Sequence, residues 1–114
     1  ELRGIDITTG ERLWQSDAMT AQDRFGTAYF VKNDDRYFVM NDAGELIIAR
    51  FTPEGYEEVD RTPLLEPTLR TRGGASGRWN DRTVLWAHPA FANQHIVVRN
   101  DREIIRASLA TVDY

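Results

Sequence analysis

The sequence predicts an all-β protein made of antiparallel sheets, and three observations support this fold class. Apolar residues alternate with polar ones at a period of two, in short runs rich in Val, Ile, Phe and Tyr. The runs are separated by Asn, Asp, Gly and Pro, which favour tight turns. One strand–turn–strand unit recurs along the chain, so the sheets are expected to be copies of one small unit.

The first expected element is a hairpin within residues 1–20. The stretch GIDITTGERLW, residues 4–14, turns at Thr-Thr-Gly and returns through alternating residues to a tryptophan. Gly10 accommodates the turn, and the side chains of Asp6 and Thr9 are suited to bond its backbone. The two strands are expected in LRGIDI and ERLWQS.

Residues 25–62 are expected to form a complete four-stranded sheet. Three turns divide this segment: NDDR at 33–36, NDAGE at 41–45 and TPEG at 52–55. Asn, Asp and Gly tolerate the positive φ that tight hairpins require, and Pro53 presets φ for the third turn. Strands are therefore predicted at 27–32, 36–41, 45–51 and 55–61.

A long connector is expected at residues 63–82. It has three glycines within five positions and is rich in arginine, whereas the preceding EGYEEVD is acidic. One interpretation is a solvated connection between sheets. The other is a ligand- or partner-binding loop at Arg72, Arg78 and Trp79, where glycine amides and arginine side chains would meet a carboxylate or phosphate. The spacing matches no phosphate-loop motif.

Residues 83–114 are expected to form a final sheet with strands at 83–89, 95–100 and 103–109. The segment from Gln94 can be laid over the segment from Arg36. Asn100-Asp101 then matches Asn41-Asp42. With one residue fewer in the turn, Glu103 and Ala107 match Glu45 and Ala49. Such repetition is typical of arrays or propellers, in which each small sheet is buried against its neighbours.

Composition excludes several classes of protein. The net charge of -4 argues against a general binder of nucleic acid or of anionic membranes, which concentrates Lys and Arg. No apolar run is long enough to span a membrane, and there is no cysteine for a disulfide or a thiolate. The length of 114 residues is that of one domain.

No residue set predicts catalysis. The only two histidines, His88 and His95, are too few for a metal centre. The pairs Asp34-Asp35, Asn41-Asp42 and Asn100-Asp101 lie in expected hairpin turns, which favour these residue types. Ser76 does not complete a Gly-x-Ser-x-Gly nucleophile elbow, because position 78 is arginine. The sequence therefore predicts no catalytic residue, no metal site and no cofactor, and an enzyme is not the favoured interpretation.

The N-terminal hairpin resembles the repeat signature of the PQQ-like (quinoprotein-like) β-propellers. Its motif positions are Gly4, Asp6, Thr9, Gly10 and Trp14, with glycine where alanine is usual. The segments 25–68 and 86–109 are similar to the closing blades of such propellers in exported bacterial proteins, although neither keeps the Asp/Thr-Gly/Trp pattern. The resemblance implies four-stranded antiparallel blades, about two per chain, and an extracytoplasmic location, periplasmic or exported.

Within this resemblance, residues 1–114 form a single partial propeller module. The outer strand pair of one blade lies at 1–20, a full blade at 25–62, the connector at 63–82 and a final blade at 83–114. The family's dehydrogenases hold a quinone and calcium over a closed ring of blades, and many have a cysteine pair that this chain lacks.

The resemblance therefore implies a non-catalytic binding or scaffold module that interacts with a protein or ligand. One alternative is a fragment of a quinoprotein-like dehydrogenase whose active site needs further blades. Another is an assembly subunit resembling the propeller scaffold of outer-membrane protein insertion.

The strand count predicts a homo-oligomer. The final blade has three expected strands where a blade has four, and an unpaired edge with alternating apolar residues invites another strand. We expect the strand around Glu11 to Ser16 of one chain to complete the final blade of another by strand exchange. Trimers or tetramers would then give six or eight blades, if each chain contributes about two.

Overall fold

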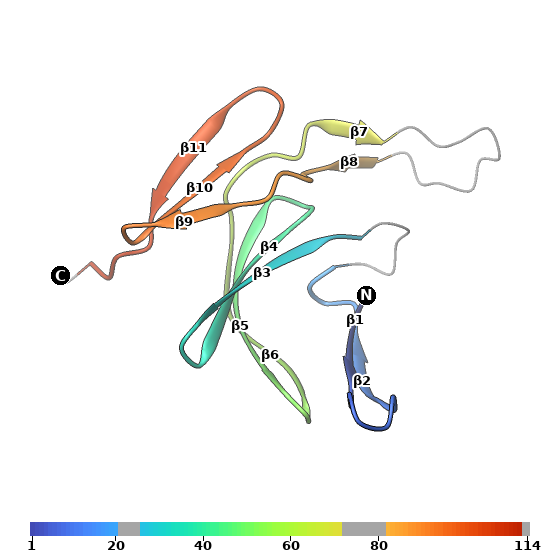
Figure 1. Cartoon of the computed structure of the whole chain (residues 1–114). Helices are drawn as coiled ribbons and strands as arrows, with labels where there is room; N and C mark the ends of the chain where they lie inside the picture. Colours follow the sequence, from blue (N-terminus) through green and yellow to red (C-terminus); the bar gives the residue numbers. More distant parts are fainter. Residues whose placement is uncertain (21–25, 72–81, 113–114) are drawn as a thin grey trace.

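The computed structural model describes residues 1–20, 26–71 and 82–112, and these form an all-β structure with antiparallel sheets (Figure 1). The described part holds eleven strands in four sheets. The fold class expected from the sequence is confirmed at this level. A closed ring of sheets is not formed by the described residues (Figure 1).

The first sheet is the N-terminal hairpin, β1 (Leu2–Ile5) and β2 (Arg12–Ser16). The second is a four-stranded meander in the order β3-β4-β5-β6. Its strands are β3 (Ala28–Asn33), β4 (Arg36–Asn41), β5 (Glu45–Thr52) and β6 (Gly55–Pro63). These bounds lie within two residues of the expected ones, because alternation and turn residues define each strand locally.

Two shorter sheets follow. The hairpin of β7 (Leu69–Thr71) and β8 (Arg82–Val84) extends away from the other sheets in Figure 1. The last sheet has the order β11-β10-β9, with β9 (Ala90–Ala92), β10 (His95–Arg99) and β11 (Ile104–Ser108). The expected connector therefore contains a strand, β7.

The strand expected at 83–89 is wrong. Residues 82–84 form β8, which pairs with β7, whereas the partner of β10 is β9 at 90–92. The intervening run is held by other contacts. Leu85 donates its backbone N–H to the carbonyl of Asp42, and Pro89 has no N–H to give to a sheet. Leu85 is buried by packing against the four-stranded sheet rather than by strand pairing, whereas Trp86 is exposed.

Other parts of the chain pack on both faces of the four-stranded sheet. Its first face carries Val39, Ile47 and Ala49, which pack with Met19 and with Leu2 of β1. Its second face carries Phe38, Met40 and Leu46. The residues packed on the second face include Leu65, Leu85, Ile96 and Val98. The N-terminal hairpin and the last sheet therefore lie on opposite faces of the four-stranded sheet (Figure 1).

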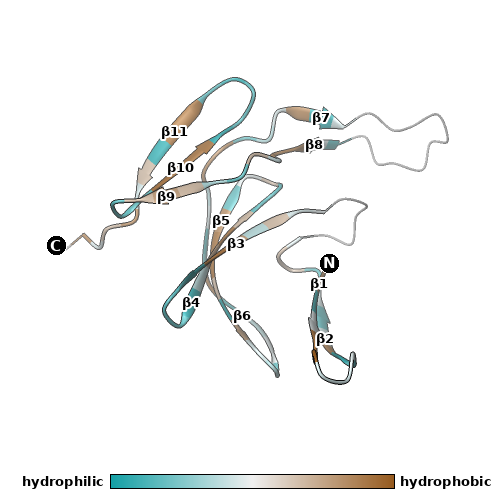
Figure 2. Cartoon of the chain, in the orientation of Figure 1, coloured by the Kyte–Doolittle hydropathy of each residue, from teal (hydrophilic) through white to brown (hydrophobic). Residues whose placement is uncertain are grey.

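The turns follow the expected chemistry. The hairpin turns after β3 and after β10 are hydrophilic (Figure 2). Asp34 and Gly44 take φ of 54° and 81°. Gly44 is required because a Cβ there would lie 1.8 Å from the carbonyl oxygen of Leu65.

Candidate interaction surfaces

The three residues predicted to bind a ligand or partner, Arg72, Arg78 and Trp79, lie outside the described residues. The structure does describe the strands on either side, where Thr71 of β7 pairs with Arg82 of β8. Binding at Arg72, Arg78 and Trp79 stays a prediction.

The repeat-motif residues build the first hairpin turn. One carboxylate oxygen of Asp6 accepts hydrogen bonds from the backbone N–H of Thr8 at 2.8 Å and from its hydroxyl at 2.7 Å. The hydroxyl bond of Thr8 is the main cause that lowers the pKa of Asp6. The hydroxyl of Thr9 accepts from the N–H of Glu11, and Gly10 has a φ of 75°. Asp6, Thr9 and Gly10 therefore have the turn roles that the sequence suggested.

Trp14 ties this hairpin to the four-stranded sheet. Its indole Nε1 donates to the carbonyl oxygen of Thr52 at 3.0 Å, and the ring is partly buried. The ring lies across Gly4, the cross-strand partner of Trp14. A Cβ at Gly4 would lie 2.3 Å from Nε1. Glycine at this position therefore allows the tryptophan to lie flat over the neighbouring strand.

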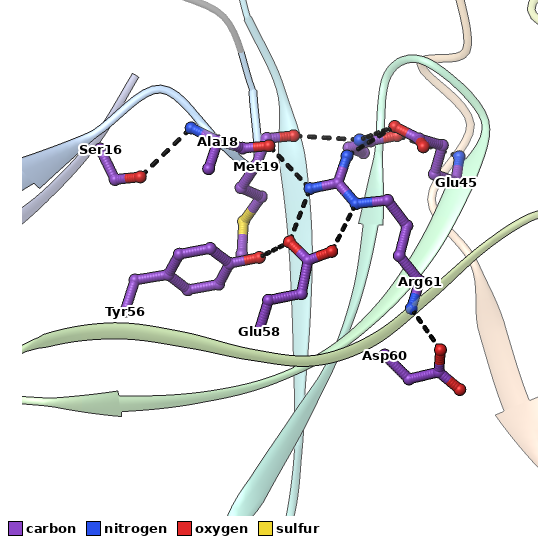
Figure 3. Close-up of polar contacts among 9 residues, drawn as sticks. Ser16, Ala18, Met19, Glu45, Tyr56, Glu58, Asp60 and Arg61 are labelled. Carbon is purple, nitrogen blue, oxygen red and sulfur yellow. Dashed lines mark hydrogen bonds and ion pairs between the residues drawn. The ribbon is translucent and has the colours of Figure 1, made fainter.

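A cluster of polar contacts around Arg61 fixes the segment that follows β2 (Figure 3). Arg61 donates to the carbonyl oxygen of Ala18 at 2.7 Å, to Glu45 at 2.9 Å and to Glu58 at 2.8 Å. Asn41 donates from its amide to the carbonyl oxygen of Met19 at 3.0 Å. We call these six residues the Arg61 cluster: Ala18, Met19, Asn41, Glu45, Glu58 and Arg61. It joins the incoming chain to three strands of the sheet.

The electrostatics of the Arg61 cluster extend to Tyr56. Its hydroxyl donates to Glu58 at 2.7 Å. Burial, followed by this hydrogen bond, raises the pKa of Tyr56 to about 12. The hydrogen bond from Arg61 lowers the pKa of Glu58. The cluster is an internally satisfied structural network, since no buried side-chain polar atom of the described residues lacks a hydrogen-bond partner.

The two asparagines matched by the sequence repeat have the same role. The carbonyl oxygen of the Asn41 side chain accepts from the N–H groups of Ala43 and Glu45. That of Asn100 accepts from the N–H groups of Arg102 and Glu103. The Asn41 amide donates to the Met19 carbonyl, and the Asn100 amide donates to the Glu66 carbonyl. Each asparagine thus closes a turn and holds an earlier segment of the chain: Asn41 holds the segment between β2 and β3, and Asn100 holds the segment between β6 and β7.

Side chains also connect the four-stranded sheet to the later part of the chain. Arg82 of β8 forms a 2.9 Å ion pair with Asp42, whose side chain is 7% exposed. The hydroxyl of Tyr29 in β3 donates to the carbonyl oxygen of Trp86. Phe38 of β4 stacks on Phe91 of β9 with ring centroids 5.4 Å apart. A groove of about 420 Å³ lies over this pair, between the turns after β3 and after β9.

The first face of the four-stranded sheet has an uncovered aromatic area. Phe30 is 41% exposed, and its ring lies 5.4 Å from that of Phe51. Tyr37 and Tyr56 contact the same Phe51 ring at 5.0 and 5.8 Å. We call Phe30, Tyr37, Phe51 and Tyr56 the aromatic patch. The N-terminal hairpin reaches Thr52 of β5 through Trp14 and leaves Phe30, on the edge strand β3, open to solvent.

The last sheet has an open edge at β11. Within the described ranges β11 pairs with β10 alone, whereas the matching strand β5 of the four-stranded sheet pairs with both β4 and β6. β2 pairs with β1 of its own chain. The unfilled position beside β11 is the place where an added strand is expected.

Sequence reasoning missed the Arg61 cluster and the aromatic patch. Arg61 is the first basic residue after the acidic residues of β6, and this position in the sequence could have indicated an ion pair within the strand. The aromatic patch combines residues of β3, β4, β5 and β6, so only strand register reveals it.

Across residues 1–20, 26–71 and 82–112, no group of three or more His, Asp or Glu side chains is placed to hold a metal ion. The same ranges contain no helix long and apolar enough to cross a membrane. No protein-family model, curated protein or solved structure matches the chain.

Proposed function

We propose that this chain is a non-catalytic propeller-type module that binds another polypeptide through its open sheet edge and uncovered sheet faces. The observation that carries the proposal is the repeated packing of whole sheets. The hairpin packs on one face of the four-stranded sheet and the last sheet packs on the other. Propellers are built from small antiparallel sheets stacked face to face, and this packing therefore supports the proposal.

The resemblance of the hairpin to PQQ-like repeats adds a second line of support. Asp6, Thr9 and Gly10 form the turn of that motif, and Trp14 reaches the next sheet. The same resemblance supports an extracytoplasmic location, periplasmic or exported.

The proposal includes self-association by strand exchange. Residues 11–16 of one chain would complete, in another chain, the sheet that ends at β11. Because β2 pairs with β1, the hairpin would be added as a unit. One chain is unable to make this contact with itself, since its hairpin and its last sheet lie on opposite faces of the four-stranded sheet.

Hydrogen exchange at low and high protein concentration tests the strand addition. Amides of β11 that do not pair with β10 should become protected at high concentration, together with amides of β2. Amides of β5, which pairs on both sides, serve as the internal control. Equal exchange of β11 at both concentrations would contradict strand addition.

A titration with pyrroloquinoline quinone and calcium tests the non-catalytic assignment. A scaffold module should show no saturable change in tryptophan fluorescence. Saturable, calcium-dependent binding would instead favour the quinoprotein-like dehydrogenase fragment.

A further inference from the structure

We propose that the aromatic patch is the docking surface for the outer face of the last sheet of a second copy of this chain. This inference rests on the proposed self-association and names the surfaces that meet. The outer face consists of Val97, Arg99, Ile104 and Arg106, on the side of β10 and β11 that points away from the four-stranded sheet.

Register defines the outer face. Along β10 and β11 the burial alternates strictly, with Ile96 and Val98 buried against the four-stranded sheet. Val97 lies opposite Arg106, and Arg99 lies opposite Ile104. Ile104 is 68% exposed. Neither guanidinium has an ion-pair partner among the residues that the structure describes.

The internal repeat indicates that the outer face corresponds to a sheet face that is packed against another sheet. Under the match of Asn100 to Asn41, Val97 and Arg99 correspond to Phe38 and Met40, and Ile104 corresponds to Leu46. In the four-stranded sheet these positions pack against the next sheet, with Met40 0% and Leu46 5% exposed. The last sheet differs by carrying arginines within the same face.

The aromatic patch suits such a face. Arg99 and Arg106 can lie over the rings of Phe30 and Tyr37, because guanidinium groups stack favourably on aromatic faces. Val97 and Ile104 can cover the apolar ring edges that Phe30 now exposes to water.

The geometry of the proposed strand exchange brings these surfaces together. If the last sheet of a second copy lies beside the hairpin β1–β2, it continues the layer that the hairpin begins. The hairpin contacts β6 and Thr52 at the end of β5, so the second copy's sheet covers the other side of the first face, at the edge strand β3, where Phe30 lies. A contact within one chain is excluded, since its own outer face lies beyond the opposite side of the four-stranded sheet.

Charge favours the same pairing. Residues 1–60 contain thirteen Asp and Glu against six Lys and Arg, whereas residues 61–114 contain five against eight. A head-to-tail contact places the basic end of one copy against the acidic end of the next, which accelerates association and makes it sensitive to salt.

Light scattering on the purified chain with matched variants tests the inference. The wild-type mass should exceed that of one chain and fall as salt is raised. Phe30→Ser and the double variant Arg99→Glu/Arg106→Glu should each reduce the mass to that of one chain. Val59→Ser, which alters a residue that is 40% exposed on β6, should leave the mass unchanged. The same is expected of Arg36→Glu/Arg102→Glu, which alters the first residue of β4 and a residue of the turn between β10 and β11.

Mixing Phe30→Ser with Arg99→Glu/Arg106→Glu gives the sharpest test. The contact is heterologous, so each variant retains one intact surface. Their equimolar mixture should form a two-chain species and nothing larger. Thermal melting checks that each variant is folded. If Phe30→Ser fails to fold, the arginine variant tests the same contact from the other side.

The outcomes separate the two proposals. A wild-type assembly that neither variant weakens would overturn this docking surface and leave strand exchange standing. A wild-type chain of single mass at every concentration would overturn both.

Discussion

The guanidinium of Arg61 donates a hydrogen bond to the carbonyl oxygen of Ala18 at 2.7 Å, across a separation of 43 residues (Figure 3). Arg61 belongs to the outer strand β6, whereas Ala18 lies in the chain that leaves the N-terminal hairpin. The same guanidinium forms ion pairs with Glu45 and Glu58. Arg61 therefore acts together with Trp14 and Asn41 to hold the hairpin and the chain that follows it on the sheet.

Replacing Arg61 by methionine should lower the free energy of unfolding by about 2 kcal/mol. The substitution keeps the apolar stem but leaves Glu45 and Glu58 without their cation and the Ala18 carbonyl without a donor. Urea denaturation gives the difference. Arg36→Met is the matched control, since Arg36 makes only an exposed 3.6 Å pair with Asp35 and its loss should cost under about 0.5 kcal/mol. Equal losses in both variants would refute the role of Arg61.

Tyr56 should make the fold sensitive to alkali. Because burial raises its pKa from 10.0 to about 12, the folded protein holds the phenolic proton more tightly than the unfolded chain does. This contribution to stability is complete below pH 10 and is lost as the pH rises toward about 12. Unfolding midpoints measured across this range should fall less steeply for Tyr56→Phe. Ultraviolet absorbance of the phenolate gives the pKa itself.

The two repeat asparagines should differ in energetic weight. Asn41 is 2% exposed and bonds to backbone or side-chain groups at four places, so Asn41→Ala should cost about 3 kcal/mol. Asn100 has the same turn role at a more exposed site, and Asn100→Ala should cost about 1 kcal/mol. Chemical denaturation of both variants measures the difference. The opposite order would contradict the burial argument.

Gly4→Ala should displace Trp14. The added methyl would overlap the indole ring, so the substitution should destabilise the protein by about 1 to 3 kcal/mol and redden the tryptophan emission. In Trp14→Phe, which lacks the indole nitrogen, the same change at Gly4 should cost less. This double-mutant comparison isolates the contact between the two residues. Additive effects would show that the ring does not depend on Gly4.

The parts of the fold that are determined by residues close together in the sequence were predictable. Strands β3 to β6 follow from alternation and from Asn, Asp and Gly in the turns. The run from Thr83 to Ala92 was not predictable, because its apolar residues suit either a strand or a segment packed on another sheet. In the structure this run packs on the four-stranded sheet, and Leu85 is buried there. Hydrogen bonds between Arg61 and Ala18, or ring contacts of Phe30, depend on register between strands and leave no periodic signal.

The pairing order of the four-stranded sheet also has a kinetic consequence. Each of its strands pairs only with the next in sequence, so its contacts close short loops and should form early during folding. The Arg61 to Ala18 bond and the Arg82 to Asp42 pair join segments 43 and 40 residues apart and should form after the transition state. Their loss would then speed unfolding and leave the folding rate nearly unchanged. We therefore expect the meander to be the folding nucleus and the long-range polar contacts to set the rate of unfolding.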